Sequence, residues 1–196
     1  KEAAQLIQGV RDVLKEFGAE NELRGIYYSD KGVWGRGHDG EASMNGLGDL
    51  RISPDGLARE ENTSKYTVND TKYGTGAHEA GHAVINHLLK SLNINPDETN
   101  KTYSRRHLER ATARKNHKLE KAVIKEAKRR YGSNPPISRY GTEGGLGEKV
   151  AEAVSDVYAN KGKANPYSKV IVDVMKDIKK GVFKPKITVT KREMGI

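Results

Sequence analysis

Apolar residues recur at helical spacing in the first part of the chain. They fall three or four positions apart and mark one face: Ala3, Leu6, Ile7, Val10, Val13, Leu14 and Phe17. Such a stripe is typical of an amphipathic helix that packs on a core. Gly18 follows at a position suited to a left-handed C-cap. The pattern therefore predicts a packed helix that ends at Gly18.

Short segments with strand character come next. Residues 25–29 read GIYYS, a turn at 30–32 leads to a piece from 33, and a longer piece covers 42–53. Aromatic and β-branched residues bounded by turn residues favour strands. We expect a small twisted antiparallel sheet, with 42–53 as an edge that can bind an extended peptide. Residues 54–76 are rich in turn residues, which predicts a long surface loop.

From residue 75 onward the pattern is mostly helical. Helices are predicted over 75–92, 104–131, 146–160 and 166–180. Pro135 and Pro136 follow the second helix and cannot continue it. Asn165 and Pro166 are suited to the N-cap and first position of the last helix. The order of elements predicts one α+β domain over 1–196, with a helix and sheet in 1–74, a helical part in 75–181 and a tail in 182–196 that is an edge strand or a linker.

Composition narrows the class of protein. The chain has 196 residues, of which 35% are hydrophobic and 31% charged, so it can form one lean core. No apolar run approaches the roughly 18 residues that cross a bilayer, and the first helix lacks the features of a signal peptide. The sequence starts at Lys1 inside a helical pattern, which suggests a piece of a longer polypeptide or a processed product. We expect a soluble protein, while its compartment is not specified by these features.

The net charge of +9 is concentrated in one segment. Residues 101–130 contain twelve lysines and arginines against three glutamates, and the rest of the chain is balanced. Such a segment can attract an acidic partner or an anionic surface, or can simply be a solvated helix face. Tyr103 is the single aromatic residue between 101 and 130, so base stacking is poorly provided for. Nucleic acid is therefore not the expected partner.

Residues 78–82 read His-Glu-Ala-Gly-His, an HExxH pattern within a predicted helix. Four residues advance a helix by about 400°, so His78 and His82 lie on one face, one turn apart, and can share a metal ion. Glu79 lies about 100° round from His78, where it can act as a general base toward water. The chain has no cysteine, so the expected single zinc ion must be held by histidines and carboxylates. A chance pattern on an ordinary helix is the alternative.

A third ligand is expected from a second helix. Ile85 and Leu88 stand where the HExxHxxGxxH subclass has glycine and histidine, so that subclass is excluded. Glu148, Glu152 and Asp156 follow one another at i, i+4 spacing and form one stripe. Like charges on one stripe repel unless a cation lies opposite, which favours a metal over a solvated acidic face. The remaining histidines lack ligand spacing and are expected to be ordinary residues: His38, His87, His107 and His117.

These motifs resemble the gluzincin metallopeptidases, over residues 73–89 and 138–158. In the thermolysin register, Glu152 would be the third ligand and Asp156 would hold a ligand histidine from behind. In the register of the anthrax lethal factor branch, Glu148 would ligate, Glu152 would stand behind, and Tyr140 in the Ser138–Gly141 stretch would point into the site. The second register is preferred because it accounts for Tyr140. The spacing from Tyr140 to Glu148 is one residue longer than expected, so both registers stay open.

The resemblance implies a zinc-dependent endopeptidase with a zincin-like fold, in which the small sheet lies over the active-site helix. The substrate would be a protein or peptide. Glu79 would be the general base, and Tyr140 would steady the oxyanion, since no histidine follows His117. Similar domains occur in phage head morphogenesis proteins and polymorphic toxins, which suggests a phage-associated protease or a secreted or delivered effector. The alternative is a zinc-stabilised structural module of a phage head protein without peptidase activity.

Overall fold

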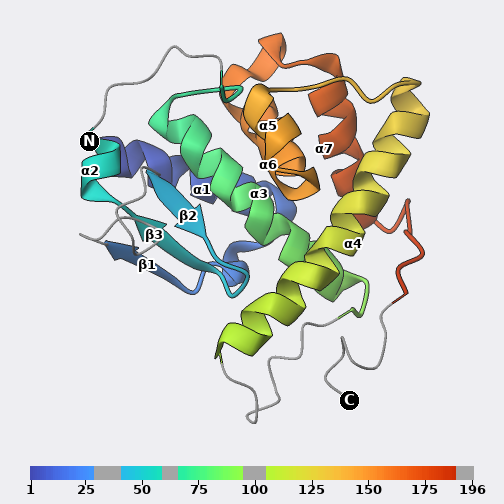
Figure 1. The fold of residues 1–196 in the computed structure, drawn as a ribbon, viewed down its shortest axis with the longest axis horizontal. Coiled ribbons are helices and arrows are strands. Elements are labelled where there is room, and N and C mark those ends of the chain that lie inside the picture. The colour runs from blue at the N-terminus through green and yellow to red at the C-terminus, as the bar shows by residue number, and fades with distance from the viewer. Residues whose placement is uncertain (29–40, 59–65, 95–104, 189–196) are drawn as a thin grey trace.

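The computed structural model describes residues 1–28, 41–58, 66–94 and 105–188, with side chains from residue 109 onward in the last range. A small sheet lies at the left of Figure 1, and the helices α4 to α7 lie at the right. Helices α1 and α3 run between these two parts. The α+β class predicted from the sequence is confirmed. None of the described helices combines the length and the apolar character that a bilayer span requires.

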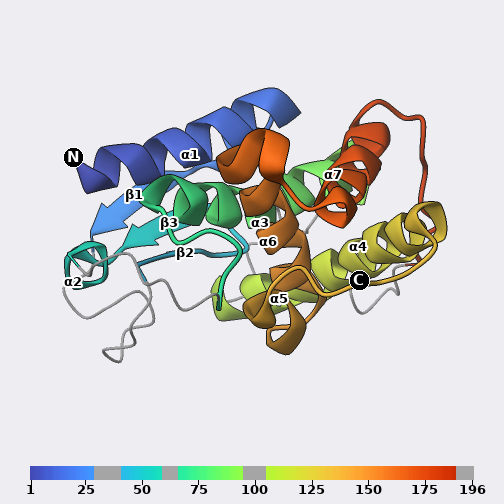
Figure 2. The same ribbon diagram turned by 90° about the horizontal axis from the view of Figure 1, so that it is seen from above.

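Helix α1 (Glu2–Phe17) packs along α3 (Lys72–Ser91), as Figure 2 shows, and glycines lie at the contact. A Cβ atom on Gly9 would stand 2.2 Å from the carbonyl oxygen of Tyr73, and one on Gly76 would stand 1.9 Å from that of Leu6. Only glycine allows the two backbones to approach so closely. The predicted C-cap at Gly18 is confirmed by its left-handed φ of 64°. Helix α1 therefore fixes the position of the helix that carries the HExxH pattern.

The three strands are β1 (Gly25–Tyr28), β2 (Ala42–Met44) and β3 (Asp49–Ile52), in the order β1-β3-β2. Strand β2 pairs with β3 in antiparallel orientation, but β1 pairs with β3 in parallel. The prediction of an antiparallel sheet is therefore wrong for β1. A hairpin requires adjacent strands in the chain, whereas residues 29–41 and β2 separate β1 from β3, so their direction is not set by a turn.

The predicted strand over 42–53 is two strands joined by a tight turn. The Oδ1 of Asn45 accepts hydrogen bonds from the backbone N–H groups of Leu47 and Asp49, at 2.9 and 3.0 Å. Gly48 has a left-handed φ of 88°, which a glycine adopts without strain. The predicted strand from residue 33 lies outside the described residues. The expected loop over 54–76 contains the short helix α2 (Pro54–Leu57) and the first turn of α3.

The remaining helices are α4 (Arg105–Tyr131), α5 (Arg139–Glu143), α6 (Leu146–Asn160) and α7 (Pro166–Lys179). Their bounds agree with the predicted helices, except that α5 was not expected. Asn165 caps α7 by accepting a hydrogen bond from the N–H of Tyr167. Residues 182–188 form neither helix nor strand, and the rest of the tail lies outside the described residues. Leu50 and Ile52 of β3 share one buried cluster with residues of α1, α3, α4, α6 and α7.

Candidate metal centre

Helix α3 directs both histidines of the HExxH pattern toward α6. The Nε2 of His78 lies 3.0 Å from Oε2 of Glu148, and the Nε2 of His82 lies 3.6 Å from the same oxygen. Each of these three residues offers a ligand atom, and the three atoms lie within 4.8 Å of one another. The close approach of α3 and α6 makes this possible, since a Cβ on Gly81 would stand 3.1 Å from Cα of Ala151. Together these side chains can hold a metal ion.

A glycine-rich turn places Glu148 in the first turn of α6. Gly145 has a φ of 92°, in the region that favours glycine. A Cβ on Gly144 would stand 2.4 Å from the side chain of Glu148, so a larger residue would displace the carboxylate. This turn was not predicted, although three glycines within the four residues Gly144-Gly145-Leu146-Gly147 are the signal that indicates it.

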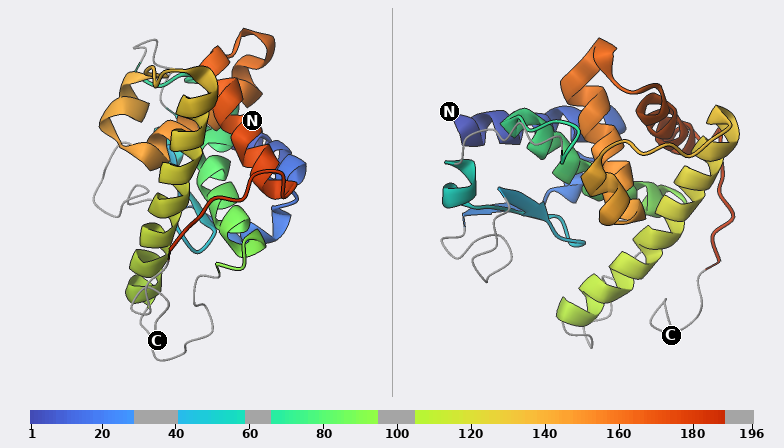
Figure 3. Two further views of the ribbon diagram at one scale, coloured as in Figure 1. Left: turned by 90° about the vertical axis from the view of Figure 1, so that its right-hand side faces the viewer. Right: turned by 45° about the horizontal axis from the view of Figure 1, so that its top comes forward.

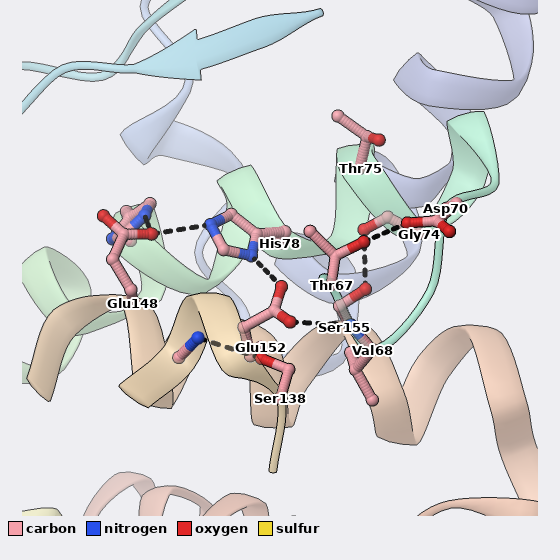
Figure 4. A network of polar contacts seen from close by, with 12 residues as sticks. Thr67, Val68, Asp70, Gly74, Thr75, His78, Ser138, Glu148, Glu152 and Ser155 are labelled. Carbon is pink, nitrogen blue, oxygen red and sulfur yellow. Dashed lines mark hydrogen bonds and ion pairs between the residues drawn. The ribbon is translucent and has the colours of Figure 1, made fainter. Parts of the chain in front are cut away.

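Glu152 lies one helical turn beyond Glu148 on α6. It contacts the imidazole ring of His78 on the side opposite to Glu148, as Figure 4 shows. The Nδ1 of His78 donates to Oε1 of Glu152 at 2.9 Å. The second oxygen, Oε2, accepts a 2.7 Å hydrogen bond from the backbone N–H of Val68. Glu152 is buried, with 2% of its surface exposed, and its hydrogen bond to Nδ1 fixes the orientation of the His78 ring.

Asp156 does not join the cluster. Its carboxylate accepts hydrogen bonds from the side chain of Asn160 at 2.7 Å and from the backbone N–H of Asn165 at 2.9 Å. The carboxylate therefore holds the turn between α6 and α7. The expectation that the whole carboxylate stripe faces one cation is wrong for Asp156, because neutral donors satisfy it.

The histidines and Glu148 shift one another's protonation. Burial lowers the pKa of His78, but hydrogen bonds to Glu148 and Glu152 outweigh it and raise this pKa to about 10. Burial raises the pKa of Glu148, but its contacts with His78 and His82 hold that pKa well below the usual range. The cluster therefore stabilises positive charge between its members, whether a proton or a metal ion supplies it.

Glu79 lies beside the cluster and is tied to the sheet. Its Oε2 accepts a 2.6 Å hydrogen bond from the backbone N–H of Met44 in β2. Burial raises the pKa of Glu79, which the neighbouring His78 and His82 partly offset. A buried carboxylate with a raised pKa accepts a proton more readily than an exposed one.

Tyr140 faces the same centre from α5. Its ring centroid lies 5.7 Å from that of His78 and 5.4 Å from that of Tyr66. Its backbone N–H donates to the carbonyl of Tyr66 at 2.8 Å, which attaches α5 to the segment before α3. Burial and the nearby Glu148 raise the pKa of Tyr140, so its hydroxyl keeps its proton. The contact between Tyr66 and Tyr140 was not predicted, since no short sequence motif links the two residues.

A cavity of about 550 Å³ adjoins the centre and reaches from β2 to α4. The glycine-rich turn lines one side of it. Helix α4 contributes five residues to the lining, among them His117, which was expected to be an ordinary residue: Glu109, Ala113, Asn116, His117 and Glu120. His87 lies elsewhere, with Nδ1 at 3.6 Å from Glu22, as expected of a partly buried polar residue. His38 and the side chain of His107 lie outside the described residues.

The basic residues of α4 contribute to a second cavity on another part of the molecule. This cavity has a volume of about 650 Å³ and lies between α4 and residues 183–186. It is lined by Lys125, Lys128, Arg129, Lys184 and Lys186, among others. An acidic partner for this surface stays a prediction. Residues 101–104 of the basic segment lie outside the described residues.

The candidate metal centre is assembled from segments that are far apart in the sequence. Helices α3 and α6 supply the three candidate ligands, while β2, α4 and α5 supply the walls of the cavity, and Figure 3 shows how these helices meet. No protein-family model matches the chain, and comparison with curated proteins and with solved structures gives no match.

Proposed function

We propose that this chain is a zinc-dependent endopeptidase. His78, His82 and Glu148 are the zinc ligands, and Glu79 is the general base. The proposal is carried by the convergence of three ligand atoms within 4.8 Å, beside a buried carboxylate and a cavity. Two histidines and one glutamate form a known donor set of catalytic zinc sites. A structural site has four protein ligands, whereas the described residues supply three, which favours catalysis.

The surroundings of His78 support zinc ligation through Nε2. A ligating histidine usually donates its other ring N–H to a carboxylate or carbonyl, which fixes the tautomer. The hydrogen bond from Nδ1 to Glu152 has this form. It favours the register of the lethal factor branch, with Glu148 as ligand and Glu152 behind the histidine, over the thermolysin register.

When bound, zinc supplies a Lewis acid that polarises the scissile carbonyl and lowers the pKa of a water to about 7. Glu79 takes the proton of the attacking water and passes it to the leaving amine. The bond from Met44 holds Oε2 of Glu79, so Oε1 is the oxygen assigned to this transfer. Tyr140 donates its hydroxyl hydrogen to the developing oxyanion, a role for which it must stay protonated.

The substrate in this proposal is a peptide in extended form. Strand β2 pairs with β3 along one edge, and its residues Ala42–Met44 line the cavity. An extended peptide can add to such an edge through backbone hydrogen bonds. The scissile bond would then pass in front of Glu79, which β2 already contacts.

The proposal is tested by comparing zinc-loaded wild type with Glu79→Gln on a diverse peptide library, with new termini identified by mass spectrometry. Glutamine keeps the shape but cannot take the proton, so cleavage should slow by at least about 10²-fold while zinc is retained. Glu126→Gln, on α4 outside the metal-centre cavity, serves as the control and should cleave as wild type. Equal cleavage by Glu79→Gln would contradict the mechanism. Full zinc binding without any cleavage would favour the structural module.

A further inference from the structure

Helix α4 carries many of the basic residues, but the face that it turns to the metal-centre cavity carries none of them. The residues of α4 that line this cavity recur at helical spacing and form one stripe: Glu109, Ala113, Asn116, His117 and Glu120. Among the described residues, no lysine or arginine side chain lines the cavity. We call these five residues the acceptor stripe. The side chains that α4 turns to the cavity include two glutamates, whereas most charged residues elsewhere on the helix are basic.

Glu120 is buried in this stripe with little compensation. Its side chain is 11% exposed, and its ion-pair partner among the described residues, Nδ1 of His117, lies 3.8 Å away on a side chain that is 63% exposed. That separation is too long for a hydrogen bond. Burying a carboxylate without donors is costly, and burial accordingly raises the pKa of Glu120 to about 7. The nearby His82 lowers the pKa of Glu120 only in part. Gly147 lies beside it, since a Cβ there would stand 3.1 Å from Oε1 of Glu120.

Two asparagines add unpaired acceptors on the same cavity. The Nδ2 of Asn86 donates to the carbonyl of Gly46 at 3.0 Å, which fixes the amide, and its buried Oδ1 has no partner within the described part of the chain. The buried Oδ1 of Asn116 also has no partner among the described residues. Unpaired buried acceptors are rare in folded proteins. Their presence beside Glu120 points to a ligand that brings several donors and a positive charge.

We propose that the α4 end of this cavity is a substrate subsite for a lysine or arginine side chain, with Glu120 as its counter-ion. This inference rests on the peptidase function proposed above. A guanidinium has five N–H donors and no acceptor, and an ammonium has three, which complements the Glu120 carboxylate and the unpaired asparagine oxygens. Because the subsite shares its cavity with His78 and Glu148, the basic residue lies close to the scissile bond.

The test uses two metal-binding probes that differ in one charge. Nα-acetyl-arginine hydroxamate and Nα-acetyl-citrulline hydroxamate share the group that chelates zinc, and citrulline is a neutral analogue of nearly the same shape. Their affinities are measured by calorimetry on zinc-loaded wild type, Glu120→Gln and Glu126→Gln. The last variant removes the same charge from α4 outside this cavity.

Wild type should bind the arginine probe about tenfold more tightly or better, as expected for a hydrogen bond to a charged group. Glu120→Gln should lose this preference while its affinity for the citrulline probe stays unchanged, which also shows an intact fold and metal centre. Glu126→Gln should keep the preference.

Other results overturn the proposal in distinguishable ways. Equal affinity of wild type for the two probes would show that the cavity has no subsite for a basic side chain, but would not contradict the metal centre. A preference that persists in Glu120→Gln removes the assignment of Glu120. Binding of neither probe to zinc-loaded protein shows that the bound zinc has no open position for a substrate, which removes the peptidase function and the subsite with it. If calcium abolishes the preference in wild type, the acceptor stripe is a divalent-cation site instead.

Discussion

The imidazole of His78 lies between two carboxylates of α6, with Nδ1 at 2.9 Å from Glu152 and Nε2 at 3.0 Å from Glu148. The two glutamates are one helical turn apart, so the sequence alone gives them equivalent positions. The structure separates them, because Glu148 also approaches His82, whereas Glu152 bonds to the backbone of Val68.

Glu148→Gln should lose most of the bound zinc, because a direct ligand is removed. Glu152→Gln should weaken zinc binding by about 10 to 100-fold, the usual effect of losing a group that hydrogen-bonds to a metal ligand. Competition with a chelator measures both. Asp156→Asn is the control and should bind zinc as wild type, since Asp156 bonds to Asn160 and Asn165. A larger loss in Glu152→Gln than in Glu148→Gln would move the ligand role to Glu152.

Zinc binding should release about one proton per chain at pH 7 to 8. In the metal-free protein the pKa of His78 is about 10, so its ring is protonated at these pH values and must lose a proton to ligate. Zinc affinity should therefore rise with pH over this range. Calorimetry in buffers with different ionisation enthalpies counts the protons. A pH-independent affinity without proton release would contradict this ligation.

Tyr140→Phe should retain zinc and substrate binding but lower kcat by about 10² to 10³-fold, as expected when an oxyanion donor is removed. Steady-state kinetics on a cleaved peptide would separate kcat from KM. Tyr66→Phe is the matched control, because its hydroxyl contacts exposed Glu143 while its ring packs on Tyr140. If Tyr140→Phe were fully active, the hydroxyl would have no part in the reaction.

Gly9→Ala should destabilise the protein by about 1 to 3 kcal/mol, the typical cost of overpacking. The added Cβ would meet the carbonyl of Tyr73 at 2.2 Å and force α1 away from α3. Gly162→Ala is the control, because nothing lies within 4 Å of its Cβ position. Urea unfolding measures both free energies. An unchanged or increased stability of Gly9→Ala would show that the helices can separate without cost.

The sequence predicted helices better than strand pairing, because helix signals are local. Gly18 and Asn165 end and begin helices through their own conformation and hydrogen bonds. The direction of β1 instead depends on the route of the chain between β1 and β2, which strands of three or four residues do not encode. The turn at Asn45–Gly48 was also missed within one apparent strand.

In the candidate site, too, the residues placed by local geometry were predicted, whereas those placed by tertiary packing were not. The joint placement of His78 and His82 follows from helical geometry within one element. The choice between Glu148 and Glu152 depends on how α6 crosses α3, which the contact of Gly81 with Ala151 fixes. The acceptor stripe on α4 was missed because Glu120, among so many lysines and arginines, has the pattern of a solvated surface, and its burial is set by tertiary packing.

His78 and Glu148 are 70 residues apart in a chain that contains no cysteine. A metal ion that joins them closes a long loop, and thereby acts as a reversible cross-link between α3 and α6 in place of a disulfide. Because such an ion binds the folded chain far better than the unfolded one, stability rises with free metal concentration. The lifetime of the protein in the presence of proteases would then depend on the local supply of the metal.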